Sequence, residues 1–288
     1  MFDSVVFYNY FGFGDLYESR EFAKDIAKII PAKEYCYAHA HSRKILADIP
    51  QLSQIGIIEE TMQPMVATQI SDNTLTINTW IGRDGRYVLP GVGCTVEKLY
   101  EMYNDVLSKL GYSSLPRTIG DYIPTFDWSY FDLERVDNFV SSYPGRKVLI
   151  SNNNVHSGQA ENFDFNPVIT ELCKMYPDIV FIICSPSLSS GGNLYTTNDI
   201  IQANDCDLVE IAYLSKSTDT IIGRNSAPHV FAQHRENWDD PTKASLSFTY
   251  TQVASHFVLN TPVKMRKYWS GAIDTETVVA NIKEVLER

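Results

Sequence analysis

Residues 5–15 read Val5-Val6-Phe7-Tyr8-Asn9-Tyr10-Phe11-Gly12-Phe13-Gly14-Asp15, an apolar and aromatic run that ends in glycines and an acid. This pattern predicts a buried β-strand followed by a tight turn. Residues 18–30 carry apolar side chains at helical spacing before Pro31, and residues 35–39 resemble a second strand. Strand, turn, helix and strand form a βαβ unit, which favours a parallel sheet with helices on its faces.

The second half of the chain repeats this order of elements. Strands are expected at residues 147–150, 179–184 and 220–223, and helices at 167–175, 207–216, 227–233 and 275–286. Between the halves, we expect strands at 55–58 and 74–78, helices at 96–110 and 133–140, and a proline-containing connection between Gly111 and Pro144. We therefore predict an α/β protein with two Rossmann-like domains, residues 1–135 and 136–288, whose mainly parallel sheets face a central cleft.

Composition limits the possible partners. The 288 residues include 24 basic and 35 acidic side chains, a net charge of −11, which disfavours nucleic acid as a partner. No apolar run approaches the roughly 20 residues that cross a bilayer, and the N-terminus does not resemble a secretion signal. The five cysteines are dispersed, so we expect reduced core thiols in a cytoplasmic protein.

The first candidate site is the turn that holds Gly12, Gly14 and Asp15. Glycines after a strand let a ligand approach the backbone, and the next helix directs free N–H groups at it. A third glycine is missing at Tyr17, so a nicotinamide dinucleotide is weakly supported. Asp15 lies where a carboxylate can take a proton from a sugar hydroxyl. The alternative is that Asp15 caps a helix that begins at Leu16.

Two polar segments in the second half are candidate anion sites. The first follows the strand at 147–150 and offers amides, a hydroxyl and a glycine: Asn153, Asn154, Ser157, Gly158 and Gln159. It lies at the carboxyl end of the sheet, although it can equally be a solvated loop. The second is Ile222-Gly223-Arg224-Asn225-Ser226-Ala227-Pro228-His229, the start of a short helix. There Arg224 can pair with a phosphate or form a structural salt bridge.

The string from Ile222 to His229 resembles the V-G-N-D-S-G-P motif of the heptosyltransferase-like glycosyltransferases, glycosyltransferase family 9 and its relatives. Gly14-Asp15 resembles their N-terminal Gly-Asp signature, although Asn225 and Ala227 replace an Asp and a Gly of the typical motif. The resemblance implies a GT-B fold and a metal-free reaction. It also implies Asp15 as the general base, with the nucleotide-sugar donor held mainly by the C-terminal domain.

Other motifs support no metal or organic cofactor. Asp205-Cys206-Asp207 has the spacing of a metal motif, but Asp207 is better explained as a helix cap. His39 and His41 lack an evident third ligand, so a packed or solvated pair is expected. Glu210 is a candidate for a ribose hydroxyl of the donor, although an exposed helical glutamate is the simpler interpretation.

The resulting hypothesis is an inverting, metal-independent glycosyltransferase that moves a sugar from a nucleotide diphosphate to a saccharide or other hydroxyl acceptor. The expected donor site comprises the residues named above: Gly12, Gly14, Asn153, Asn154, Ser157, Gly158, Gln159, Glu210, Arg224, Asn225, Ser226, Ala227 and His229. A nucleotide-sugar epimerase of similar architecture and a non-catalytic nucleotide- or glycan-binding protein remain as alternatives.

Overall fold

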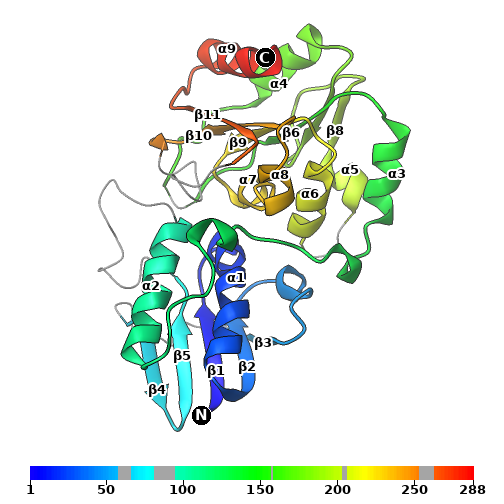
Figure 1. Cartoon of the computed structure of the whole chain (residues 1–288). Coiled ribbons are helices and arrows are strands. Elements are labelled where there is room, and N and C mark those ends of the chain that lie inside the picture. Colours follow the sequence, from blue (N-terminus) through cyan, green and yellow to red (C-terminus); the bar gives the residue numbers. More distant parts are fainter. Residues whose placement is uncertain (58–65, 81–94, 157, 203–205, 253–262) are drawn as a thin grey trace. The chain divides into compact units, whose positions relative to one another are not determined.

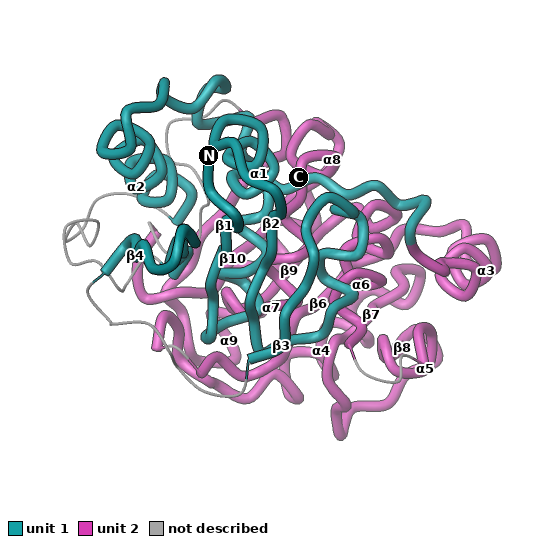
Figure 2. The backbone as a smooth tube through the Cα atoms, turned by 90° about the horizontal axis from the view of Figure 1, so that it is seen from below, with its two compact units in different colours: residues 1–130, 256–262 teal, residues 131–255, 263–288 magenta. Residues whose placement is uncertain are grey.

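The structure is a computed structural model that describes residues 1–57, 66–80, 95–156, 158–202, 206–252 and 263–288. The chain divides into two compact units, coloured separately in Figure 2. Unit 1 comprises residues 1–130 and 256–262, and unit 2 comprises residues 131–255 and 263–288. Among the described helices, none combines the length and the apolar character that crossing a bilayer requires.

Unit 1 is built on a five-stranded sheet in the order β3-β2-β1-β5-β4. Its strands are β1 (Phe2–Asn9), β2 (Ala32–His39), β3 (Ser53–Gly56), β4 (Thr68–Ser71) and β5 (Thr74–Asn78). Four of them are parallel, and β4 runs antiparallel to β5 at one edge. Strand β1 is central, so the residues that follow it emerge in the middle of the sheet's carboxyl edge.

Two helices, α1 (Phe13–Ile29) and α2 (Thr95–Lys109), pack against one face of this sheet (Figure 1). Their contact buries a stack of aromatic rings, in which Phe22 lies 5.0 Å from Tyr103 and 4.2 Å from Tyr122. Short 3-10 helices η1 (Arg43–Leu46), η2 (Ile119–Tyr122) and η3 (Trp128–Tyr130) complete the described part of the unit. The apolar face predicted for residues 96–110 is therefore the buried face of α2.

Unit 2 contains a six-stranded, fully parallel sheet in the order β11-β10-β9-β6-β7-β8. The strands are β6 (Lys147–Ser151), β7 (Val180–Ile183), β8 (Leu194–Thr196), β9 (Thr220–Arg224), β10 (Ala244–Phe248) and β11 (Arg266–Ser270). Numbered from β6, this is the 3-2-1-4-5-6 order of a dinucleotide-binding fold. The strand order reverses between β6 and β9, which is the topological switch point of this sheet.

Helices cover both faces of the second sheet, as a parallel sheet requires. Alternate residues of β6 show the two sides: Val148 and Ile150 pack with α4 (Asn166–Met175) and α9 (Thr275–Leu286), whereas Leu149 belongs to the opposite core. That core includes residues from α3 (Glu134–Ser142), α5 (Thr197–Ile201) and α6 (Leu208–Ser215). Two short helices, α7 (Ala227–Phe231) and α8 (Arg235–Trp238), complete the unit.

Each predicted element corresponds to an observed one, although the bounds differ and several short elements, β4, β8, α5 and α8, were not predicted. Helix α1 begins at Phe13, five residues before the predicted start, because residues 10–12 complete the turn from β1 and Gly12 is the N-cap. Strands β10 and β11 were not predicted, since their alternating serines and charged residues lack a continuous apolar run. The unit boundary after Tyr130 falls inside the predicted connection between Gly111 and Pro144.

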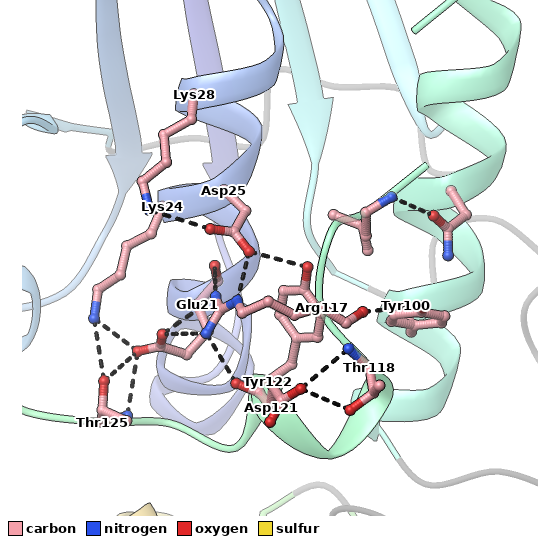
Figure 3. A network of polar contacts seen from close by, with 12 residues as sticks. Glu21, Lys24, Asp25, Lys28, Tyr100, Arg117, Thr118, Asp121, Tyr122 and Thr125 are labelled. Carbon is pink, nitrogen blue, oxygen red and sulfur yellow. Dashed lines mark hydrogen bonds and ion pairs between the residues drawn. The ribbon is translucent and has the colours of Figure 1, made fainter. Parts of the chain in front are cut away.

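A network of ionic contacts ties the end of unit 1 to helix α1 (Figure 3). The Arg117 guanidinium donates to the Asp25 carboxylate at 2.6 Å and lies 3.4 Å from that of Glu21. It also donates to the Asp121 carbonyl at 2.9 Å and covers the Tyr122 ring at 4.5 Å. Both carboxylates are buried, so removing the cation leaves them poorly compensated.

Glu21 makes the same segment sensitive to pH. Burial raises the pKa of Glu21, but the opposing effects, among them the charge and hydrogen bond of Lys24, are together larger. The pKa therefore lies below the ordinary 4.5. The same carboxylate accepts from the Thr125 hydroxyl at 2.8 Å and from its N–H at 3.2 Å. Its ionised form therefore stabilises the folded unit, and this contribution is lost as the pH falls below about 4.5.

We expect Arg117→Ala to lower the free energy of unfolding by about 3 kcal/mol at pH 7, because two buried carboxylates lose their shared cation. Urea unfolding of the variant and the wild type measures the difference. Lys109→Ala, which removes an exposed pair with Asp105, is the control and should cost less than about 0.5 kcal/mol. Equal effects of the two substitutions would show that the network contributes no special stability.

Candidate functional site

The strand order of the first sheet reverses at β1, which makes the carboxyl edge beside this strand a topological switch point. The chain passes from β1 to β2 and β3 on one side, and places β5 on the other side. Ligands of open α/β sheets bind outside the carboxyl ends of the strands at such a point. Residues 10–15 and 79–80 follow β1 and β5 directly, so they occupy this position.

Asp15 is the third residue of α1, and its carboxylate accepts a hydrogen bond from the N–H of Gly12. A Cβ at position 12 would lie 2.7 Å from Asp15 Oδ2, so the absence of a side chain at Gly12 makes room for the carboxylate. The alternative that Asp15 is the N-cap of a helix from Leu16 is wrong: Gly12 is the N-cap, and Gly14 lies in the first turn.

The Asp15 carboxyl has an unusual affinity for protons. Burial raises its pKa from 3.8 to about 6, and the backbone hydrogen bonds from Gly12 and from its own N–H only partly oppose this effect. At neutral pH the group is mostly ionised but is a stronger base than an exposed aspartate. This is the range in which a carboxylate serves best as a general base.

Glu18 is a second acid on the same helix that sequence reasoning missed. It is 6% exposed, and both burial and the Asp15 charge raise its pKa well above the ordinary value. A hydrogen bond with the Thr95 side chain acts in the opposite direction. The signal was available, because acids three residues apart in a helix share a face. The first turns of α1 therefore hold two carboxyl groups that resist simultaneous ionisation.

The carboxyl edge of the second sheet brings together the two polar segments predicted to bind the donor. Gln159, from the loop after β6, donates through Nε2 to the Asn225 carbonyl after β9 at 2.8 Å. The strands approach closely here: a Cβ on Gly223 would lie 2.6 Å from that of Ser151. Ser226 and Ala227 follow Asn225 at the start of α7. These residues border the topological switch point of this unit, where the strand order reverses between β6 and β9.

Arg224 does not fit the predicted contact with a phosphate. It is 2% exposed and donates to three carbonyls, those of Asn153 at 3.0 Å, Phe163 at 2.7 Å and Asn152 at 2.5 Å. The guanidinium also lies 4.8 Å from the centre of the Phe165 ring. Burial lowers its pKa. The predicted alternative, a salt bridge, is not seen with any described residue, and Arg224 instead fixes the shape of the loop through carbonyl oxygens.

The loop after β6 has both fixed and exposed members. Asn153 donates to the Ser185 hydroxyl at 2.6 Å, while its buried Oδ1 has no hydrogen-bond partner among the described residues. Asn154 is exposed, and Gly158 is exposed with a φ of 72°, a conformation that favours glycine. Ser157, also predicted for the donor site, lies outside the described residues.

His229 and Glu210 lie in the interior. His229 is fully buried, with Nε2 2.8 Å from the Ser247 hydroxyl, and burial lowers its pKa to about 3. It is therefore neutral and enclosed, which corrects the expectation that it contacts the donor. Glu210, in the first turn of α6, is 6% exposed, so the interpretation as an exposed helical glutamate is wrong.

The candidate metal ligands do not assemble within the described part of the chain. No group of three His, Cys, Asp or Glu side chains there has the spacing of a metal site. His39 is buried and pairs with the Gln54 side chain at 3.0 Å, and the His41 ring packs against Phe13 at 4.2 Å. Asp207 precedes α6 as its N-cap residue, without a side-chain capping bond, and Asp205 is not among the described residues.

Comparison with solved structures identifies the fold. A glycosyl transferase family 9 protein from Veillonella parvula superposes with a TM-score of 0.55 at 10% identity, over 98% of this chain and 90% of the other. E. coli heptosyltransferase WaaC with ADP superposes with a TM-score of 0.54 at 11% identity, over 99% of both chains. A putative UDP-N-acetylglucosamine 2-epimerase from Listeria monocytogenes superposes with a TM-score of 0.50 at 7% identity, over 100% of this chain and 89% of the other.

No protein-family sequence profile matches the chain, and a search of curated sequences found no match. The structural neighbours are glycosyltransferases and an epimerase that share two mainly parallel α/β units. The chain accordingly has the GT-B fold of the heptosyltransferase-like glycosyltransferases, and the predicted fold class is confirmed. At such low identity, the likeness concerns architecture alone.

We expect Asp15→Asn to stabilise the protein at high pH. Because the folded-state pKa of Asp15 is raised, ionisation destabilises the fold, and this penalty grows as the pH rises from about 4 to about 6. Above pH 6 the free energy of unfolding of the variant should exceed that of the wild type by about 3 kcal/mol, and at pH 3 the two should be equal. Unfolding in urea at both pH values measures this, and a pH-independent difference would contradict the assignment.

We expect Arg224→Lys and Arg224→Ala to loosen the loop at residues 152–163, because an ammonium group cannot span three carbonyls. The alanine variant should lose about 3 kcal/mol of stability. Hydrogen exchange of the loop amides measures the local effect. Arg235→Ala, which removes an exposed pair with Asp239, is the control. Unchanged protection in both Arg224 variants would refute the clamping role.

Proposed function

We propose that the protein is a glycosyltransferase that moves a sugar from a nucleotide-diphosphate donor to the hydroxyl of an acceptor, with inversion at the anomeric carbon. The observation that carries the proposal is Asp15, a carboxylate with a pKa of about 6 at the topological switch point of unit 1. A base of this strength removes a hydroxyl proton without being permanently protonated at neutral pH.

In the proposed reaction, Asp15 takes the proton of the acceptor hydroxyl as its oxygen attacks the anomeric carbon. The bond from that carbon to the diphosphate oxygen breaks in the same displacement, and the diphosphate leaves with its electron pair. Attack from the opposite side inverts the configuration. The proton stays on Asp15 until the product departs.

The donor is assigned to the carboxyl edge of unit 2. Exposed Asn154 and Gly158, together with half-buried Gln159 and Asn225, present amide and backbone groups along one edge of the sheet. The unpartnered Asn153 Oδ1 is an acceptor suited to a hydroxyl of the donor. We propose that these groups stabilise the departing diphosphate without a metal ion, with Arg224 shaping the loop from behind.

The proposed place of action is the cytoplasm, the compartment that keeps thiols reduced. The four cysteines that the structure describes, Cys36, Cys173, Cys184 and Cys206, are buried and unbridged. This pattern supports the assignment.

We expect Asp15→Asn to lower kcat by about 10²- to 10⁴-fold, the usual contribution of general-base catalysis, and to leave the Kd of the donor nearly unchanged. Activity of the wild type should rise with pH through about 6, as the carboxyl ionises. Turnover by coupled release of nucleoside diphosphate and calorimetry with the donor give the two quantities. Asp105→Asn, on the outer part of α2, is the matched control.

The same assay separates the alternatives. Donor converted to a different sugar in the absence of acceptor would favour an epimerase, whose fold is similar. Binding of donor with no turnover for any acceptor would favour a non-catalytic protein. Turnover that vanishes in EDTA and returns with added metal would overturn metal independence. Turnover retained in Asp15→Asn would remove Asp15 from the mechanism.

A further inference from the structure

Two stacked aromatic side chains follow the adjacent strands β1 and β5, at the carboxyl edge of the sheet from which helix α1 begins. The ring of Phe11, directly after β1, stacks on that of Trp80, after β5, with centroids 4.5 Å apart and an interplanar angle of 27°. Tyr10 meets the edge of Phe11 at 5.6 Å. All three residues are only half-buried. Phe11 precedes Gly12 in the chain, and the Gly12 N–H binds the Asp15 carboxylate, so one short segment carries a ring of the stack and a hydrogen bond to the candidate base.

The stack is held by a matched pair of asparagines at the ends of adjacent strands. Asn9 Oδ1 accepts from the Phe11 N–H at 2.9 Å, and Asn78 Oδ1 accepts from the Trp80 N–H at 3.0 Å. Both asparagines are at most 2% exposed. The same Asn-x-aromatic turn thus follows each strand and fixes the backbone that carries each ring. Such ordering lowers the entropic cost of binding a flat ligand.

Asn78 retains an unused donor at this position. Its Nδ2 is buried and has no hydrogen-bond partner among the described residues. Asn78 pairs with Tyr8 in the parallel register, so the two side chains leave the same face of the sheet. Because Oδ1 is bound at Trp80, the carboxamide is turned toward the carboxyl edge. A buried amide donor without a partner is costly unless a ligand or water completes it.

We propose that the Phe11–Trp80 stack is a binding platform for a sugar ring of the acceptor, with the Asn78 amide as a hydrogen-bond donor to it. Sugar rings combine an apolar C–H face with peripheral hydroxyls, and so suit an aromatic surface beside amide and carboxylate groups. The inference rests on the proposed function for its connection to Asp15, and it narrows the acceptor to a saccharide.

A nucleotide is the other ligand that stacks on aromatic rings, and the local charges oppose it. Asp15 and Glu18 lie in the first turns of α1, where their carboxyl groups occupy the positive end of the helix dipole. A diphosphate bound at the same edge would meet the Asp15 charge. An uncharged sugar bears no such cost, and its hydroxyl gains from a basic carboxylate.

Saturation-transfer NMR on the whole chain tests the platform without turnover. The probes are glucose, galactose, N-acetylglucosamine, maltose and lactose, with ADP and UDP as nucleotide probes. We expect transfer to the C–H protons of at least one sugar in the wild type, a loss of about tenfold or more in affinity in Trp80→Ala, and a smaller loss in Phe11→Leu. Circular dichroism verifies that the variants are folded.

The chain supplies a matched control. Phe126 and Trp128 stack with the same geometry, 4.5 Å and 27°, but do not follow a strand of the sheet. Trp128→Ala should leave sugar binding unchanged. No transfer to any sugar, or equal transfer in wild type, Trp80→Ala and Phe11→Leu, would overturn the platform. Transfer to the base protons of ADP or UDP that is lost in the same variants would assign the platform to a nucleotide and refute the proposal.

Asp15→Asn separates this inference from the proposed function. The variant should still bind the same sugar in a Trp80-dependent manner, with a smaller loss of affinity than Trp80→Ala, while losing turnover. Full turnover in Asp15→Asn, with sugar binding still dependent on Trp80, would reject the base but retain the platform. Lost turnover in Asp15→Asn, with sugar binding independent of Trp80, would retain the base but reject the platform.

Discussion

Each sheet is built outward from a central strand in two opposite directions, and this constraint determines where ligands can reach the backbone. From β1 the chain goes first to β2 and β3, and β5 later returns to the other side. From β6 it goes to β7 and β8 before β9 returns in the same way. At the carboxyl edge, the loop that follows the central strand and the loop that follows the returning strand therefore lead in opposite directions. A ligand can approach the backbone between them. The candidate residues of both units lie at these two points.

Local packing then decides which polar groups at those points are free to react. In unit 1, a helix that begins directly after Gly12 carries half-buried Asp15 and buried Glu18 in its first turns, and desolvation raises the pKa of both carboxyl groups. In unit 2, packing has the opposite effect: Arg224 and His229 are enclosed, so the more exposed polar groups of the described loop residues there are backbone groups and amides. Charge is thus concentrated at one edge, and neutral donors and acceptors at the other.

The sequence was sufficient for the longer helices, for the central strands of both sheets and for the place of Asp15 after the first strand, because apolar periodicity and glycine placement are local signals. It was insufficient for Arg224, whose carbonyl partners precede it by 71 and 72 residues for Asn153 and Asn152. A cation in a polar turn has the same local appearance whether it binds an anion or a buried loop. The spacing of Glu18 from Asp15 indicated a shared helix face, but the burial that raises the pKa of Glu18 depends on the tertiary structure. Strands β10 and β11 were missed because their pairing in the sheet, rather than their composition, defines them.

The Arg117 network has a mechanical consequence. The segment that leads out of unit 1 is attached at Thr125 to Glu21, and the N–H of Asp127 is bound by Asp48 at 3.0 Å. Asp48 in turn pairs with buried Arg20 of α1. Tension applied to the chain beyond residue 127 is therefore borne by side chains of α1, the helix whose first turn positions Asp15.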